Sequence, residues 1–466
     1  MSTLIALSDI ISSGIEKIAA RCAASGDAYP TLDDPYTLAN NSVQSRYASD
    51  AAPIIAAAYQ LIATLSNPDP YLFTWGLVSF FNASVAVASE GCVPDILREA
   101  GPKGLHVDSI AAKNKMDPGK LGRILRLLAS RHVFTEVSPD VFCNNRISKA
   151  LCTGNSPTVM MEKPLERWNG SNGTSAMAEW CGIDALKMAA FLVDNVTDPE
   201  TAHSQEPNKA SVQRVFNTDI DFHSWQQKPE NAYRRNRFQH MMRSLTYYSS
   251  EDASSGGVEW ASLPPKSIVV DVGGGIGTLT MDLVAQHQHI NYVVQDLPSA
   301  IAQARTYWST TNPDALRNGQ VHLREHDFFA PQPLTNPSVY MLRYIMHNWP
   351  DAYCIKILSH LRDAAGPSTQ LFVLDHILDY LSRDTTGLND DIPGAARPMA
   401  PEPLLPYPDS VTEYGYLMDI LMMGELNSQE RTLKHFETMF RKAGWKLERV
   451  CRFPAPHPQQ LICSPL

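Results

Sequence analysis

A histidine at the end of a predicted strand is the first candidate for chemistry. Residues 339–351 read Val-Tyr-Met-Leu-Arg-Tyr-Ile-Met-His-Asn-Trp-Pro-Asp, so that His347 closely follows an apolar run. In folds that alternate strands and helices, working groups lie beyond the carboxyl ends of the strands. Histidine, with a reference pKa near 6.5, is suited to accept a proton from a phenolic hydroxyl. We interpret His347 as a candidate general base; the alternative is a satisfied buried histidine at a helix start.

A carboxylate on the far ring nitrogen would orient such a histidine and stabilise its imidazolium form. Two acids are candidates for this role. Asp375 lies late in the apolar run Leu371–Asp375, where a charge needs a reason. Glu430 stands just before a predicted helix, where pairing with Arg431 or with the helix dipole is an equally physical account. The residue pattern alone leaves these alternatives open.

The second informative segment is rich in glycine. Residues 267–277 read Ser-Ile-Val-Val-Asp-Val-Gly-Gly-Gly-Ile-Gly, with glycines at alternate positions from Gly273 to Gly277. Ser267–Val272 has the continuous apolar character of a strand buried on both faces, and Thr278–His287 is typical of a helix. Glycines between a strand and a helix let the backbone turn tightly and approach a ligand closely.

The spacing of these glycines separates two kinds of nucleotide site. A dinucleotide fingerprint, G-x-G-x-x-G, would need its third glycine where Thr278 stands. The pattern D-x-G-x-G-x-G from Asp271 instead resembles motif I of S-adenosylmethionine-dependent methyltransferases. Asp296 ends a second strand about 20 residues after the loop, where an acid accepts hydrogen bonds from ribose hydroxyls. The alternative is that Asp296 only caps the helix at Pro298.

Composition limits the classes of protein and partner. The chain has 466 residues and a formal net charge of −10, which predicts more than one domain and argues against a nucleic-acid partner. Eight scattered cysteines without a C-x-x-C pair or clustered histidines predict no metal site and a reducing cytoplasm. We expect no signal peptide and no stretch approaching the roughly 18 apolar residues of a membrane span.

Element patterns divide the chain into three predicted domains. Residues 1–160 read as helices followed by a helix–helix–hairpin unit that resembles a winged helix, which we interpret as a dimerisation domain because the protein is acidic. Residues 161–250 form a helical connector rich in aromatic residues and methionine. From residue 251 to residue 466, strands and helices alternate, which predicts a Rossmann-like α/β domain with a mainly parallel sheet and helices on both faces.

Two features of these domains bear on substrate binding. The connector supplies a candidate substrate pocket, although such residues are usually core; its members are Phe222, Trp225, Phe238 and Met242. A proline-rich insertion at 382–409 interrupts the last domain, and loops of this length are usually lids or disordered.

Several segments in one order resemble the class II O-methyltransferases of the caffeate and hydroxyindole type. The segments that carry the resemblance are His347 with Trp349 and Asp351, the Asp375 strand, and Met418-Asp419 followed by Glu430-Arg431-Thr432. Phe216–Asp219 and Phe222–Trp225 resemble the fungal branch of that family. The resemblance covers nearly the whole chain and implies a homodimer.

The resemblance also implies roles for individual residues. The general base would be His347, flanked by Asp375 and Glu430. Contacts to S-adenosylmethionine would come from the glycine loop and the strand ends beside it, namely Asp271, Gly273, Gly275, Asp296, Asp327, Phe328 and Arg343. The chain departs from the family pattern at five positions, namely Arg343, Asn348, Asp375, Asn427 and Ser428. These departures bear on the spacing between the base and its two acids.

Three functions remain open from the sequence. The first is an S-adenosylmethionine-dependent O-methyltransferase that methylates a hydroxyl of an aromatic or polyketide-type secondary metabolite. The second is a methyltransferase-like pericyclase or dehydratase that binds the cofactor without transferring its methyl group; Arg343 and the altered surroundings of the base keep this alternative open. The third is a winged-helix regulator or scaffold, against which the glycine loop, Asp296 and His347 speak together.

Overall fold

The computed structural model describes residues 2–247, 257–383, 391–407, 410–453 and 457–466. Parts of the predicted insertion, 384–390 and 408–409, therefore lie outside the described residues. The chain forms two compact units. Unit 1 comprises residues 1–194, 212–248 and 401–404, and unit 2 comprises residues 195–211, 249–400 and 405–466.

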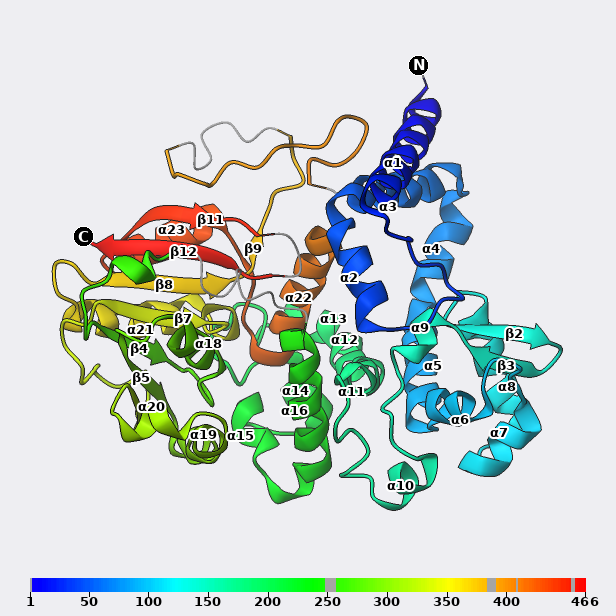
Figure 1. The fold of residues 1–466 in the computed structure, drawn as a ribbon, viewed down its shortest axis with the longest axis horizontal. Helices are drawn as coiled ribbons and strands as arrows, with labels where there is room; N and C mark the ends of the chain where they lie inside the picture. Colours follow the sequence, from blue (N-terminus) through cyan, green and yellow to red (C-terminus); the bar gives the residue numbers. More distant parts are fainter. Residues whose placement is uncertain (1, 248–256, 384–390, 408–409, 454–456) are drawn as a thin grey trace. The chain divides into compact units, whose positions relative to one another are not determined.

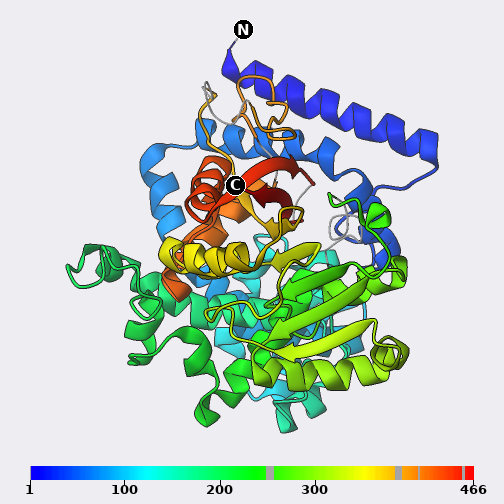
Figure 2. The same cartoon turned by 90° about the vertical axis from the view of Figure 1, so that its left-hand side faces the viewer.

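Unit 1 is mostly helical and contains one small sheet. Strands β1, β3 and β2 form this sheet in that order, with antiparallel pairing. Helix α1 packs along α3 (Figure 2). The described elements are α1 Thr3–Ser25, α2 Leu38–Arg46, α3 Ala48–Leu65, α4 Pro68–Gly76, α5 Val78–Glu90, α6 Val93–Ala100, β1 Leu105–His106, α7 Val107–Asn114, α8 Pro118–Ala129, β2 Phe134–Ser138, β3 Val141–Asn144, α9 Arg146–Lys149, α10 Pro157–Glu162, α11 Thr174–Trp180, the π-helical turn Cys181–Ala185, α12 Leu186–Ala190, α13 Leu192–Thr197, α14 Ser211–Phe216, α15 Phe222–Gln226 and α16 Ala232–Tyr247.

Two helical stretches of unit 1 are unusually apolar and exposed. Ala48–Leu65 and Pro68–Glu90 have the length and composition of a membrane span, so the expectation that no stretch approaches one was wrong. Much of this apolar surface is uncovered within the single chain, including Phe73, which is 70% exposed, and Phe80, which is 64% exposed. Contiguous exposed apolar surface marks an interaction site.

Unit 2 contains a seven-stranded sheet in the order β11-β12-β8-β7-β4-β5-β6 (Figure 1). The pairings among β4, β5, β6, β7 and β8 are parallel, while β12 is antiparallel to both β8 and β11. The elements are β4 Ile268–Val272, α18 Thr278–Gln286, β5 Asn291–Asp296, α19 Pro298–Thr311, α20 Pro313–Arg317, β6 Val321–Glu325, β7 Val339–Arg343, α21 Asp351–Ala364, β8 Gln370–Asp375, β9 Ile377–Leu378, α22 Ser410–Leu426, β10 Arg431–Thr432, α23 Leu433–Lys442, β11 Trp445–Cys451 and β12 Gln459–Pro465.

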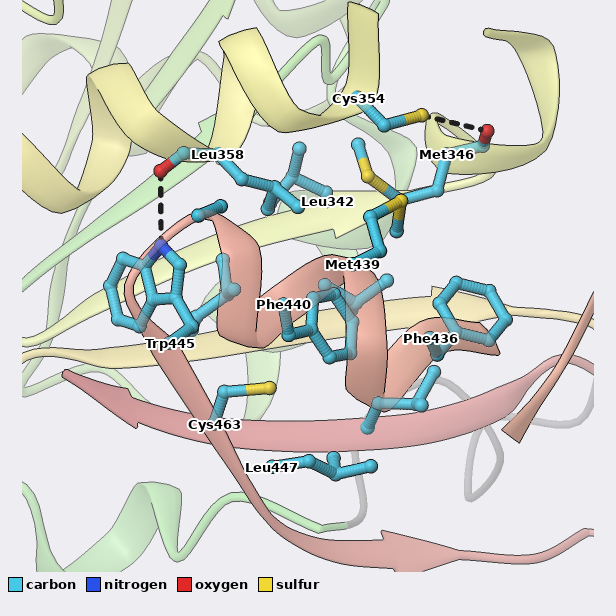
Figure 3. Packing of buried hydrophobic residues seen from close by; sticks show 14 of the residues in the cluster. Leu342, Met346, Cys354, Leu358, Phe436, Met439, Phe440, Trp445, Leu447 and Cys463 are labelled. Atoms are coloured by element: carbon cyan, nitrogen blue, oxygen red, sulfur yellow. Dashed lines mark hydrogen bonds between the residues drawn. The ribbon is translucent and has the colours of Figure 1, made fainter. Parts of the chain in front are cut away.

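Alternate residues of each central strand enter different cores. In β8, Leu371 and Val373 pack with α21 and α23, whereas Phe372 and Leu374 pack on the opposite face with α18 and α19. Figure 3 shows the first core, where the Trp445 indole N–H donates to the Leu358 carbonyl oxygen at 3.0 Å. Strands buried on both faces explain the continuous apolar runs in the sequence. The predicted Rossmann-like fold with helices on both faces is confirmed.

Strand order determines where a ligand can bind. The chain adds β5 and β6 on one side of β4 and then returns to place β7 and β8 on the other side. Such a reversal opens a crevice at the carboxyl ends of the two strands that flank it, here β4 and β7. The glycine loop follows β4 and His347 follows β7, so both candidate segments lie at this crevice.

One predicted strand is broken in the structure. Gln370–Leu378 reads in the sequence as one apolar run typical of a single strand, but it divides into β8 and β9, with His376 between them. Strand β8 pairs with β7 and β12, whereas β9 leaves that sheet to pair in parallel with β10. Since β10 begins one residue after Glu430, this departure brings the Asp375 and Glu430 segments together.

Candidate active site

The glycine loop is tightly packed on one side and open on another. Three of its glycines have positive φ, a backbone conformation that favours glycine: Gly273, Gly275 and Gly277. A Cβ atom at Gly273 would lie 2.7 Å from Ile345 Cδ1, and one at Gly277 would lie 2.8 Å from the Trp308 indole nitrogen. At Gly275, by contrast, a Cβ would meet nothing within 4 Å. The backbone at Gly275 is thus accessible to a ligand.

Two acids predicted at this loop have different surroundings. Asp271 is buried beneath the loop and accepts a hydrogen bond from the Thr280 hydroxyl at 2.7 Å. Burial raises the pKa of Asp271 to about 6. Asp296, in contrast, is partly exposed and accepts a hydrogen bond from the Gly275 N–H at 2.8 Å. Asp271 therefore supports the loop from below, while Asp296 ties the next strand end to its accessible part.

The structure also brings the other predicted cofactor residues near this loop. The Arg343 guanidinium donates to the Thr278 hydroxyl at the start of α18, at 2.6 Å. The Phe328 ring would lie 3.2 Å from a Cβ placed at Gly273. The neighbouring Asp327 is exposed and accepts a hydrogen bond from the Phe329 N–H at 2.9 Å. Arg343 is therefore tied to the start of the helix after the loop through the Thr278 hydroxyl. The cofactor roles of Arg343, Phe328 and Asp327 stay predictions.

His347 lies against both predicted acids. Its Nδ1 atom is 2.9 Å from Glu430 Oε1 and 3.9 Å from Asp375 Oδ1. Its backbone N–H donates to Asp375 Oδ2 at 3.3 Å, which fixes the turn that carries the ring. The side chain of His347 is 12% exposed, and both carboxylates are fully buried. With Nδ1 held by Glu430, Nε2 is the ring atom left for a ligand.

Charge and burial compete at this cluster. Burial opposes a charge on the His347 ring, but the adjacent Glu430 and Asp375 carboxylates outweigh it and raise the pKa of His347 to about 9. Burial raises the pKa of Asp375 to about 6. Burial alone would raise the pKa of Glu430, but the adjacent His347 cation holds the pKa of that carboxyl below its usual value. Without ligands, the cluster is therefore an imidazolium beside a carboxylate at neutral pH.

Arg431 holds the turn that carries His347. Its side chain is fully buried and donates to the carbonyl oxygens of Met346, at 2.6 Å, and Trp349, at 2.7 Å, on either side of His347. Its Nε atom donates to Asp351 at 2.9 Å, and Asp351 is also 2.6 Å from His435 Nε2. Arg431 thus joins the His347 turn to the chain beside Glu430, and its hydrogen bonds among the described residues go to backbone carbonyl groups and to Asp351 rather than to Glu430.

Residues near the base that sequence reasoning missed are aromatic. The Tyr344 ring lies 5.5 Å from the ring of His347 and 5.5 Å from the ring of His376. Tyr344 has φ of +55°, which is uncommon for a bulky side chain. The only sequence signal for these residues was their position directly after strands β7 and β8.

The predicted substrate-pocket residues lie in unit 1. Phe222, Trp225 and Phe238 form one aromatic cluster, in which Phe222 lies 5.5 Å from Phe238 and 6.1 Å from Trp225. Phe222 and Trp225 are buried, whereas Met242 is 41% exposed. The structure therefore groups three of the four residues, and their contact with a substrate stays a prediction.

Two models of known protein families match different parts of the chain. A model of the O-methyltransferase domain matches residues 205–390, and a model of the O-methyltransferase dimerisation domain matches residues 76–154. An O-methyltransferase of Armillaria gallica is 39% identical over 98% of this chain and 97% of its own length. A protein named 4-O-methyltransferase 1, from Phanerochaete chrysosporium, is 38% identical over 97% of this chain and 95% of its own length.

Solved structures share the fold. One described as a pericyclic reaction enzyme has a TM-score of 0.67 and 19% sequence identity, covering 91% of this chain and 98% of that chain. The complex of LepI with S-adenosylmethionine has a TM-score of 0.66, with the same identity and the same coverage.

Proposed function

Because the chain belongs to the O-methyltransferase family, we propose that it methylates a hydroxyl of an aromatic or polyketide-type secondary metabolite, with His347 as the general base. The observation that carries this proposal is the pair formed by His347 and Glu430, 2.9 Å apart, at the carboxyl end of β7. The acceptor would be a small molecule, and the site of action the cytoplasm. The eight cysteines, all within the described ranges, form no disulfide, which fits a reducing compartment.

The cofactor of this enzyme family is S-adenosylmethionine, which when bound supplies an electrophilic methyl group. The residues of the loop fit it in two ways. The open backbone at Gly275 admits a ligand at close range, and Asp296 beside it offers a carboxylate to ribose hydroxyls. We therefore assign cofactor binding to Gly273, Gly275, Asp296 and Phe328, with Asp271 and Arg343 supporting the loop.

Acid–base chemistry at His347 follows from its partners. Glu430 holds Nδ1 and thereby directs Nε2 toward an acceptor hydroxyl. The imidazolium formed after proton transfer is stabilised by the buried carboxylates of Glu430 and Asp375. General bases of this kind contribute about 10²- to 10⁴-fold to a rate.

One observation favours a second candidate function. A His347 whose pKa lies near 9 is a hydrogen-bond donor at neutral pH, and a donor can polarise a carbonyl in a dehydration or pericyclic reaction. In that case the product would form without gaining a methyl group. Mass spectrometry of the product separates the two functions, since only methyl transfer increases its mass by one methyl group.

The rate of methyl transfer is expected to rise with pH toward about 9, because only the neutral ring of His347 accepts a proton. Glu430→Gln removes one of the charges that stabilise the imidazolium, so the midpoint of this rise should move to lower pH while the maximal rate falls. The measurement is kcat against pH for both proteins. Glu99→Gln, an exposed acid in α6, is the control and should leave the midpoint unchanged. An unshifted midpoint in Glu430→Gln would contradict the pairing.

The enzyme is expected to be a homodimer, because the chain has an O-methyltransferase dimerisation domain and because the helices just before it and at its start carry exposed apolar side chains. Phe73→Glu together with Phe80→Glu places charges on that surface and should convert the dimer to a monomer. Light scattering after size-exclusion chromatography measures the change. Leu297→Glu, an equally polar change at an exposed leucine of unit 2, is the control and should leave the mass of the dimer unchanged. Elution of the wild-type protein as a monomer at micromolar concentration would refute this expectation.

A further inference from the structure

A short polar segment belongs to unit 2 although the chain on either side of it belongs to unit 1. Residues 195–211 are part of unit 2, whereas 1–194 and 212–248 are part of unit 1. Within this piece, residues 201–206 read Thr-Ala-His-Ser-Gln-Glu and form a tight bend, in which the Ser204 N–H donates to the Thr201 carbonyl oxygen at 3.0 Å. A segment with so few apolar side chains depends on hydrogen bonds for its position.

The first anchor of the segment 201–206 is the side chain of Asn427. Its Nδ2 atom donates to the carbonyl oxygens of Ser204, at 2.9 Å, and Glu206, at 3.0 Å. Asn427 directly follows α22 and has φ of +52°, a conformation that asparagine adopts more readily than most residues. One amide group thus satisfies two backbone carbonyl groups of a segment that is distant in the sequence.

The second anchor is Tyr353 on α21. Its hydroxyl donates to Glu206 Oε2 at 2.6 Å. The hydrogen bond to Glu206 raises the pKa of Tyr353 to about 12, so the hydroxyl remains a donor at neutral pH. The Tyr353 ring stacks on Trp349, with centroids 5.8 Å apart. Because Trp349 lies two residues after His347, the second anchor holds the segment to the helix that follows the base.

Asn427 begins the turn that holds the base. The next residue, Ser428, is buried, and its hydroxyl donates to the His347 carbonyl oxygen. Glu430, three residues after Asn427, lies 2.9 Å from His347 Nδ1. The turn 427–430 therefore contacts both the backbone and the ring of His347. Asn427 and Ser428 are also two of the positions at which the chain departs from the family pattern.

We propose that Asn427 is a positioning residue, which braces the turn 427–430 against the segment 201–206 and thereby keeps Ser428 and Glu430 on His347. Its part in the reaction rests on the proposed function, since His347 is the general base there. Asn427 acts only through its neighbours in the turn. Loss of its two hydrogen bonds therefore loosens the aim of the His347 ring and leaves the glycine loop unchanged.

The test variant is Asn427→Gly, because glycine keeps the positive φ without strain and removes both hydrogen bonds. With phenol and catechol as acceptors, kcat should fall about tenfold, since small misplacements of reacting groups lower rates strongly. The affinity for S-adenosylhomocysteine should stay within about twofold, which also shows that unit 2 is folded. Asn427→Asp keeps the size of the side chain but cannot donate to a carbonyl oxygen, so its kcat should fall as well.

The matched control is Asn336→Gly. Asn336 also has φ of +52°, is exposed and precedes β7, at the opposite end of that strand from His347. This change should leave kcat unchanged. Wild-type kcat in Asn427→Gly would show that only the backbone conformation matters at this position, and it would overturn the proposal.

A second readout is independent of methylation. The proton between His347 Nδ1 and Glu430 should give a far-downfield proton resonance in the complex with S-adenosylhomocysteine, assigned by its absence in His347→Gln. This resonance should broaden in Asn427→Gly, because the proton exchanges faster with water, and should be unchanged in Asn336→Gly. An unchanged resonance in Asn427→Gly would overturn the proposal.

The two readouts separate the positioning role from the proposed function. If the wild-type protein methylates no acceptor but the resonance broadens in Asn427→Gly, the proposed function fails and the positioning of His347 by Asn427 stands. If the wild-type protein methylates an acceptor and Asn427→Gly matches it in kcat and in the resonance, only the positioning role fails.

Discussion

Replacing His347 by glutamine is expected to lower the rate of methyl transfer by about 10³-fold. Glutamine can still donate a hydrogen bond to Glu430 but cannot take a proton from the acceptor hydroxyl. The glycine loop is built from other residues, so the affinity for S-adenosylhomocysteine should remain within about twofold of wild type. Turnover is measured by chromatography of the methylated product, and affinity by calorimetry.

The matched control for this variant is His322→Gln, because His322 is an exposed histidine on β6. It should leave turnover unchanged. A chelator is also expected to leave wild-type turnover unchanged, although His347, Asp375 and Glu430 present donor atoms within 4.8 Å of one another. Undiminished methylation by His347→Gln would remove His347 from the mechanism.

Arg431→Met should have the second largest effect, acting on both stability and rate. The change leaves two backbone carbonyl groups and Asp351 without a buried guanidinium, which costs about 3 kcal/mol in free energy of unfolding. It also releases the turn that aims His347, so kcat should fall even where the protein remains folded. Urea unfolding, monitored by tryptophan fluorescence, measures the loss of stability. The loss of rate is measured as kcat without urea, at a low temperature at which the variant remains folded.

Two further variants show whether the guanidinium geometry matters. Arg431→Lys keeps the charge but cannot reach both carbonyl oxygens with a planar fork, so it should recover only part of the stability. Arg441→Met, at an exposed arginine on α23, should change stability by less than about 0.5 kcal/mol. Wild-type stability and turnover in Arg431→Met would show that the clamp is dispensable.

Much of unit 2 could be predicted from the sequence, because its strands are buried on both faces and read as continuous apolar runs. The strand predicted at Ser267–Val272 is found at Ile268–Val272. The break between β8 and β9 could not be predicted, since Ile377 and Leu378 continue the apolar run although they pair with a different strand. Only the partner strand β10, more than fifty residues later, determines where β8 ends.

The approach of His347 to Glu430 and Asp375 followed from family resemblance, whereas the residue pattern alone left Glu430 open to pairing with Arg431. The structure resolves that alternative by directing Arg431 to backbone carbonyl groups around His347. Such partners leave no trace in sequence, because every residue carries a carbonyl group. The contacts of Tyr344 and His376 were missed for a similar reason, since ring contacts between two strand ends depend on the sheet order.

The most direct test of methyl transfer uses S-adenosylmethionine labelled with isotope in its methyl group. In a single turnover with the physiological acceptor, the product is expected to carry the labelled methyl group on oxygen, and His347→Gln should lose that transfer while still binding the labelled cofactor. A product that forms without the label, with the labelled cofactor recovered intact, would contradict methyl transfer and favour the pericyclic or dehydrating reaction.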